Sequence, residues 1–422
     1  MRSSAAVEPQ EHRERQRRAR EAAAARGLRT LVSFSRGGGA HDRMADGLWL
    51  TGLATPQPFV PDLPGHWRAA GHVAVVVAVD GPVTAVVESE DLRPAAVADE
   101  VVVSEDLLAS AAAAVVDALP AREPARVGVL GADAVPFVWW TALDELVRSA
   151  RPHAALEAAD DLGMTLRRIK SPAEQRLLRD AGNLGAHAMA AALDVAAPGA
   201  SEAEVAAALI EHVVREGGAI YDVAVSSGAA SGTLGPAGGA AGAAGWTTRR
   251  LRNGELLRID AYGSVAGYLF DFARTIVVGG PASDDQVELI DAMRTSVMAG
   301  VAALRPGVAL SEVVHACEDA LAASAHARRH GVPDHLMGGF WGHGLGLGFE
   351  PPWIGPQSTA VVEPGWCLAV ERRAAVPGLG GAQYEENVLI GSDGAELLSV
   401  SQRGRDLGGR RQASQQLPDL PL

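Results

Sequence analysis

The sequence predicts a protein of mixed α/β (α+β) class that is organised in two domains. Its 422 residues are 48% hydrophobic, which is enough for two cores of ordinary size. Segments typical of strands and of helices alternate over the first 160 residues, as in an α/β domain. Long capped helices and long strands of alternating polarity follow, and they indicate a second domain.

The first predicted domain covers residues 9–163 and follows a disordered N-terminus at residues 1–8. Its segments are assigned from apolar periodicity, turn residues and alanine content. In chain order they are a helix (9–26), two short strands (27–35 and 46–54), a hairpin that turns at Asp80-Gly81 (72–89), a helix (105–119) and a buried strand (125–132).

The second predicted domain covers residues 164–401 and starts with a strongly marked helix. Ser171 can cap this helix, Pro172 suits its first position, and Glu174 completes the spacing of a capping box. Three signals of different physical origin therefore agree on one helix start.

Further helices and two flexible segments complete the second half of the chain. Ser201 and Glu204 repeat the capping-box spacing, and a Pro-Gly turn opens a helix within residues 305–323. The glycine- and alanine-rich residues 228–245 predict a flexible loop that is suited to act as a lid. Residues 402–422 lack periodicity and predict a flexible tail.

Charge and hydropathy exclude several kinds of partner. A formal net charge of −14 disfavours nucleic-acid binding, because phosphate contacts require a basic surface. The apolar runs are too short to cross a bilayer, and the N-terminal residues lack the apolar segment of a secretory signal. We therefore expect a cytoplasmic protein with a small-molecule or short-peptide substrate, in which Cys317 and Cys367 are buried free thiols.

Four acidic residues and one histidine are candidates for a common site. Asp260 and Asp271 lie on two strands joined by a glycine-containing connection, which can bring their carboxylates together. Two like charges so placed require a cation. His343 lies in the stretch WGHGLGLGFEPPWI, and Glu371 and Glu385 lie in two later strands. Taken singly, each acid has a surface position as its structural alternative, and the histidine a core position.

The order Asp, Asp, His, Glu, Glu resembles the dinuclear metal site of the M24 superfamily. These "pita-bread" metallopeptidases include methionyl aminopeptidase, aminopeptidase P, prolidase and creatinase. The motifs that carry the resemblance are R-x-x-K-S-P-x-E at 167–174, D-x-x-x-x-x-x-G-Y-x-x-D-x-x-R-T at 260–275, G-H-G-x-G at 342–346, E-P-G at 363–365 and G-x-x-x-E-x-N-V at 381–388. The resemblance implies a creatinase-like N-terminal α/β domain followed by a pita-bread catalytic domain.

The same resemblance implies a set of metal ligands and a catalytic residue. It implies that two divalent metal ions are held by Asp260, Asp271, His343, Glu371 and Glu385. One imidazole and four carboxylates suit manganese, iron, cobalt or zinc. Two such ions activate water and polarise a carbonyl, and Glu371 is the candidate to accept the proton of the reacting water. Relatives with two domains are commonly dimers, which implies a homodimer.

The sequence departs from the family on the substrate side of the site. In the family pattern H-G-x-G-x-x-x-H-E-x-P, the second histidine falls on Glu350, or a one-residue deletion has removed it. A further histidine, 17 or 18 residues before Asp260, is missing from the segment GAAGWTT. Gln383 stands where the family has an arginine, two residues before the last ligand.

Five residues are candidates for substrate binding in this altered region. They are Trp246, Trp341, Glu350, Arg373 and Gln383. Side chains alternate along a strand, so Arg373 shares the face of Glu371 and Arg372 takes the opposite face. Arg373 is hypothesised to replace the lost arginine in binding an anion, and a solvated surface arginine is the alternative.

Three functions are compatible with these motifs. The preferred one is a dinuclear-metal hydrolase of an amide or other C–N bond, similar to Xaa-Pro aminopeptidase or creatinase, that acts on a small specialised substrate. Weak cleavage of ordinary Xaa-Pro peptides is expected, because one missing donor costs about 10²–10³ in rate at comparable sites. The alternatives are a non-hydrolytic lyase on the same fold and a non-catalytic interaction protein, against which the intact ligand set argues.

Overall fold

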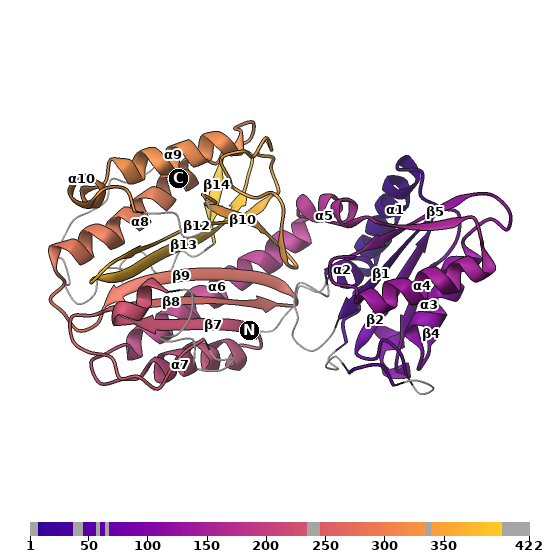
Figure 1. Cartoon of the computed structure of the whole chain (residues 1–422), viewed down its shortest axis with the longest axis horizontal. Helices are drawn as coiled ribbons and strands as arrows, with labels where there is room; N and C mark the ends of the chain where they lie inside the picture. The colour runs from indigo at the N-terminus through magenta and orange to yellow at the C-terminus, as the bar shows by residue number, and fades with distance from the viewer. Residues whose placement is uncertain are drawn as a thin grey trace.

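The computed structural model describes residues 7–36, 45–55, 60–63, 67–233, 245–333 and 339–398. They form two lobes, with the N-terminal one at the right of Figure 1 and the C-terminal one at the left. The segments expected to be disordered or flexible fall wholly or partly outside these ranges, at residues 1–6, 234–244 and 402–422.

The N-terminal lobe is built on a six-stranded mixed sheet with the order β4-β3-β2-β1-β5-β6. Its strands are β1 (Thr30–Arg36), β2 (His72–Ala78), β3 (Val83–Val87), β4 (Glu100–Val103), β5 (Ala125–Leu130) and β6 (Ala154–Ala158). Its helices are α1 (Pro9–Ala25), α2 (Ala45–Thr51), α3 (Leu107–Asp117) and α4 (Phe137–Ala150), with a short 3₁₀ helix η2 (Glu90–Ala95). The predicted α/β class, the hairpin and the helix around 105–119 are confirmed.

Both faces of this sheet are covered, which explains the apolar run of β2. Val73 and Val75 lie in the core shared with α1 and α2, whereas Ala74 and Val76 lie in the core shared with α3 and α4. All seven residues of β2 are buried. A strand buried on both faces reads as continuously apolar, as this one does.

The strand predicted at residues 46–54 is wrong, because this segment forms helix α2. The Thr51 hydroxyl donates to the carbonyl of Gly47 one helical turn earlier, at 2.7 Å. Gly52 follows with a φ of +74°, the left-handed conformation that commonly ends a helix. Gly47 also lets α2 approach β1, since a Cβ on it would lie 2.3 Å from the Ser35 hydroxyl.

The C-terminal lobe contains two sheets, β7-β8-β9 and β11-β10-β12-β13-β14. The strands are β7 (Ala219–Ser227), β8 (Leu256–Val265), β9 (Tyr268–Val277), β10 (Gly342–Leu345), β11 (Phe349–Glu350), β12 (Cys367–Val376), β13 (Gly380–Ile390) and β14 (Ala395–Leu397). The helices are α6 (Pro172–Val195), α7 (Glu202–Arg215), α8 (Asp284–Ala303), α9 (Leu310–Ala322) and α10 (Ala325–His330), with the 3₁₀ helix η3 (Gly228–Gly232).

The two sheets meet along β9 and β13, with helices on their outer sides. Figure 1 shows α6 and α7 along the three-stranded sheet and α8 and α9 along β12 and β13. Apolar residues of α6 and α7 pack with those of β8 and β9, and those of α8 and α9 pack with β12 and β13. Part of the lid predicted at 228–245 is structured, because its first residues form η3.

Helix α5 (Asp160–Arg168) and the start of α6 join the lobes. Ser171 caps α6 in a complete capping box with Glu174, as predicted, and Ser201 and Glu204 do the same for α7. The expected domain boundary at 163/164 lies within α5. No helix in the described part of the chain is long and apolar enough to cross a membrane.

Candidate metal centre

The β8–β9 hairpin places two aspartates on one face. A two-residue turn, Ala266-Gly267, joins the strands, and both of its residues have positive φ, at 50° and 86°. Such turns match the right-handed twist of a hairpin. Asp271 pairs with Tyr262 and Asp260 pairs with Ala273, so the two aspartates are diagonal neighbours. Diagonal neighbours on one sheet face are within side-chain reach.

Strands β12 and β13 supply two glutamates to the same centre. Glu371 and Glu385 are directly opposite each other in the antiparallel register. Both are buried, with 6% and 1% of their surface exposed. Two directly opposed carboxylates repel, so this cross-strand pair is unfavourable unless a cation lies between them.

Side chains connect the two strand pairs at β9 and β13. The Asn387 amide donates to the backbone carbonyl of Asp271 at 2.6 Å and accepts from its N–H at 2.8 Å. Thr275 lies four residues after Asp271 on β9. Its hydroxyl donates to the Gln383 backbone carbonyl at 3.1 Å and accepts from the Gln383 backbone N–H at 2.9 Å. Between β9 and β13, the side chains of Asn387 and Thr275 thus make hydrogen bonds of the kind that backbone groups make within a sheet. They hold Asp271 near Glu385.

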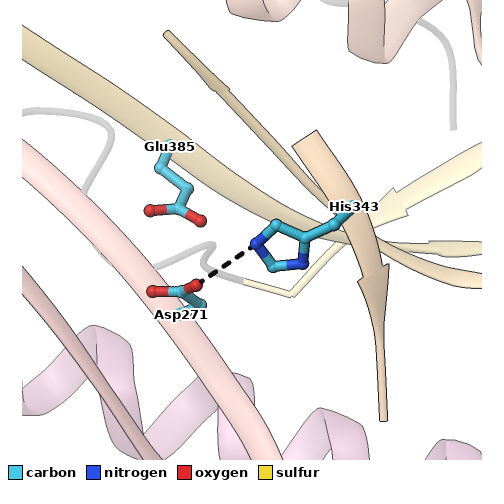
Figure 2. Close-up of side chains that lie close together, drawn as sticks. All are labelled: Asp271, His343 and Glu385. Atoms are coloured by element: carbon cyan, nitrogen blue, oxygen red, sulfur yellow. Dashed lines mark ion pairs between the residues drawn. The ribbon is translucent and has the colours of Figure 1, made fainter. Parts of the chain in front are cut away.

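His343 on β10 completes the group, and Figure 2 shows its ring directed at Asp271. The imidazole Nε2 lies 3.6 Å from Asp271 Oδ2 and 4.0 Å from Glu371 Oε1. Its Nδ1 is 3.0 Å from the Gly344 carbonyl, which can only accept, so Nδ1 carries the proton. Nε2 therefore presents its lone pair to the acids, as a metal-ligating histidine does.

The electrostatics of the four carboxylates fit a bound cation. Burial first, and then the neighbouring acids, raise the pKa values of Asp271 and Glu385 well above the usual range. Glu385 Oε1 is buried and has no hydrogen-bond partner among the described residues. Ligand atoms of Asp271, His343 and Glu385 all lie within 4.8 Å of one another. A buried cluster of this composition is neutralised either by protonation or by bound cations, and its raised pKa values show that it needs one of the two.

Glu371 is a candidate both for a metal ligand and for a proton acceptor. Burial and the Asp260 carboxylate raise the pKa of Glu371 to about 7, while Gln383 and Arg373 act in the opposite direction. Asp260 is also the most accessible acid of the group, with 26% of its side chain exposed. These two carboxylates mark the side of the centre that a substrate can reach.

An aromatic cavity opens beside His343. A pocket of about 310 Å³ is lined by Phe340, Gly342, His343, Trp353 and Glu371. Phe349 also packs on the imidazole, with ring centroids 4.7 Å apart. Phe349, and not Glu350, therefore occupies the place beside His343, which supports the one-residue deletion expected as an alternative from the sequence.

The two tryptophans named from the sequence lie elsewhere. Trp341 is fully buried in the core formed with α8 and α9, and Arg372 stacks on its ring with its carbon Cζ 4.6 Å from the centroid. Trp246 packs against the core of α6, α7 and β8. Trp353, in the same stretch as His343 and 47% exposed, lines the cavity.

Glu350 is engaged by the protein itself. Its carboxylate accepts from Lys170 Nζ at 2.6 Å and from Arg167 Nε at 3.1 Å, and all three side chains are buried. These two cations lower the pKa of Glu350 despite its burial. The carboxylate joins β11 to the α5–α6 connection, so we do not retain Glu350 as a substrate-binding residue.

Glu350→Gln is expected to lower the free energy of unfolding by about 3–5 kcal/mol, because it leaves the buried ammonium of Lys170 without its counter-charge and removes one of the two carboxylate partners of Arg167. Metal content should not change. Chemical denaturation of the metal-loaded protein measures the effect, and Glu396→Gln is the matched control. Glu396 pairs with Arg179 at 2.7 Å, but both side chains are exposed, so its loss should cost at most about 1 kcal/mol. A Glu350 effect as small as that of the control contradicts the structural role.

Arg258 is a residue of this site that the sequence analysis missed. It lies on β8 two residues before Asp260 and is fully buried. Its Nη1 is 2.9 Å from Gln383 Oε1 and 3.5 Å from Asp260 Oδ2. Gln383 in turn donates from Nε2 to Glu371 Oε2 at 3.2 Å. Gln383 thus connects the Arg258 guanidinium to Glu371, a candidate metal ligand.

Comparison with known proteins gives consistent matches. Residues 176–392 match the sequence model of metallopeptidase family M24. The chain is 31% identical over 240 residues to the uncharacterized peptidase YqhT of Bacillus subtilis, covering 56% of this chain and 63% of that protein. It is 30% identical over 248 residues to a Xaa-Pro dipeptidase of Pyrococcus furiosus, covering 58% and 66%. The matched region thus spans just under two thirds of these relatives.

Solved structures share the fold over nearly the whole chain. The prolidase of Pyrococcus horikoshii superposes with a TM-score of 0.73 at 19% identity, covering 92% of this chain and 99% of that one. The dipeptidase PepE of Mycobacterium ulcerans gives 0.73 at 24% identity, covering 95% and 98%. Both lobes of this chain are therefore covered by these matches.

Proposed function

Because this chain belongs to metallopeptidase family M24, we propose that it is a dinuclear-metal hydrolase that cleaves an amide or other C–N bond in a small substrate. The observation that carries the proposal is the buried group of Asp260, Asp271, Glu371 and Glu385 around His343 Nε2. When two divalent cations are bound there, they lower the pKa of water and polarise the scissile carbonyl.

The residues of this chain supply the remaining steps. Glu371 accepts the proton of the attacking water, because its carboxylate borders the cavity beside His343. Gln383 orients the Glu371 carboxylate through its amide. The aromatic side chains of Phe340 and Trp353 bound the cavity beside His343 and limit its access to water.

The metals, the substrate and the assembly are proposed as expected from the sequence. The cations are manganese, iron, cobalt or zinc, since oxygen ligands and one imidazole suit all four. The substrate is a small molecule or short peptide of Xaa-Pro or creatine-like type, and the enzyme is a cytoplasmic homodimer. Phe349 beside His343 favours a specialised substrate over ordinary Xaa-Pro peptides, because a phenyl ring cannot donate a hydrogen bond to a substrate amide.

Elemental analysis combined with product analysis tests this function. Purified protein is expected to bind two divalent cations per chain, and chelation should abolish turnover until a cation is restored. Products formed in ¹⁸O-labelled water should carry the label on the new carboxylate. Turnover without label uptake indicates the lyase alternative. A protein that binds no divalent cation would contradict the proposal and favour a non-catalytic role.

A further inference from the structure

Arg373 is a buried guanidinium next to the candidate metal centre. It lies on β12 two residues after Glu371, on the same strand face, and directly opposite Gln383 in the register. Only 4% of its surface is exposed. The alternative of a solvated surface arginine is therefore wrong.

Arg373 has no hydrogen bond or ion pair of its own among the residues that the structure describes, and its Nε is buried without an acceptor. The nearest charges are Arg258, Asp260 and Glu371. Burial, followed by the charge of Arg258, lowers the pKa of Arg373 to about 10. A buried guanidinium beside a second one is unfavourable unless an anion accompanies it, and the two nearby carboxylates are candidate ligands whose charge bound cations would take up.

Arg258 differs from Arg373 because each of its three nitrogens already donates a hydrogen bond. Its Nε donates to the Ser231 carbonyl at 3.1 Å and its Nη2 to the Thr233 carbonyl at 2.9 Å. Its Nη1 donates to the Gln383 amide oxygen. Arg258 and Gln383 are thus structural neighbours of the site, and Arg373 is the cation whose donors remain for a ligand.

A count of charges shows what the loaded centre lacks. The four carboxylates contribute −4, two divalent cations contribute +4, and Arg258 and Arg373 contribute +2, so the sum is +2. One substrate carboxylate reduces this excess from +2 to +1. Residues two apart on a strand are separated by about 7 Å, so this group lies within a few bonds of the C–N bond that is held beside Glu371.

We propose that Arg373 is a specificity-determining residue that binds a carboxylate of the substrate, and that the substrates are N-acylated small amino acids or dipeptides with a free carboxylate near the scissile C–N bond. This inference rests on the proposed hydrolase function. The planar guanidinium matches a carboxylate with two parallel hydrogen bonds, and a lysine at this position does not.

Binding of N-acetylglycine and its neutral analogue N-acetylglycinamide tests the inference. Calorimetry on the zinc-loaded protein should show that the acid binds about 10- to 100-fold more tightly than the amide. In Arg373→Met the acid and the amide should bind about equally tightly, because the affinity for the acid falls and the affinity for the amide stays unchanged. Arg373→Lys should retain part of the preference. An unchanged preference in Arg373→Met overturns the inference.

Two controls separate this inference from folding and from the proposed function. Arg372→Met removes a buried arginine from the opposite face of the same strand and should leave the acid preference intact. Metal stoichiometry is measured on every sample. If the protein binds two cations and hydrolyses substrate but shows no preference for the acid, only the role of Arg373 is contradicted. If the protein binds no cations and hydrolyses nothing, the proposed function is contradicted.

Discussion

Asp271→Asn is expected to reduce the bound cations from two per chain to one or none and to lower kcat/KM more than about 100-fold. Replacing a residue that only holds a metal ligand in place typically lowers activity about 10- to 100-fold, so a larger loss indicates a ligand. The carboxylate is buried between Asp260, Glu371 and Glu385, and the amide offers neither its charge nor its second oxygen donor. Elemental analysis and steady-state kinetics measure the two effects.

Thermal denaturation distinguishes this loss from misfolding. Cations stabilise the native state by mass action, so the wild type should melt higher when they are added, and the variant should not respond. Without cations, the variant should be at least as stable as the wild type, because it carries one fewer buried negative charge. Asp393→Asn, at an exposed turn position, is the control and should behave as wild type. Two tightly bound cations in Asp271→Asn would refute the ligand assignment.

Phe349→His is expected to raise kcat/KM for Gly-Pro by at least tenfold, from a wild-type value below about 10⁴ M⁻¹s⁻¹, the lower end of ordinary enzymes. The Phe349 ring lies 4.7 Å from His343, so an imidazole there can donate to the substrate amide. One such donor contributes about 10²–10³ in rate at comparable sites. Steady-state assays on Gly-Pro and Xaa-Pro-Pro peptides measure the gain.

The control for this gain is Phe349→Leu, which opens similar space without adding a donor. It should leave peptide cleavage weak. Equal gains in the leucine and histidine variants would mean that crowding, and not the missing donor, limits the reaction. Wild-type activity already above 10⁴ M⁻¹s⁻¹ would show that another group replaces the lost imidazoles.

The grouping of residues at the candidate metal centre is largely predictable from the sequence, because local patterns determine most of its positions. Alternation along β8 and β9 fixes the faces of Asp260 and Asp271, and the short connection fixes their proximity. What brings Asp271 to Glu385 was not predictable in this way. Asn387 and Thr275 make the connection through side chains across 116 and 108 residues of sequence, respectively, and no periodic pattern reports such contacts.

The substrate side was less predictable because single residues there have several compatible environments. Trp341 and Trp353 are equally prominent in the sequence, yet one supports the core and the other lines the cavity. Arg258 gave no signal, since an arginine inside an apolar strand becomes informative only when its partners Ser231 and Thr233 are known. Gly52, which ends α2, is a signal for a helix end, but the apolar pattern of residues 46–54 favours a strand over the same segment.

Lys170 is the only lysine of the chain, and its side chain is 3% exposed against Glu350 where the two lobes join. Every other cationic side chain that stays charged at neutral pH is an arginine. A reagent that acylates primary amines therefore has one side-chain target, and it reaches that target only when the joint loosens. The α-amino group reacts as well, so acylation is followed on the peptide that contains Lys170, and its rate becomes a clock for the opening of this joint, without an engineered probe.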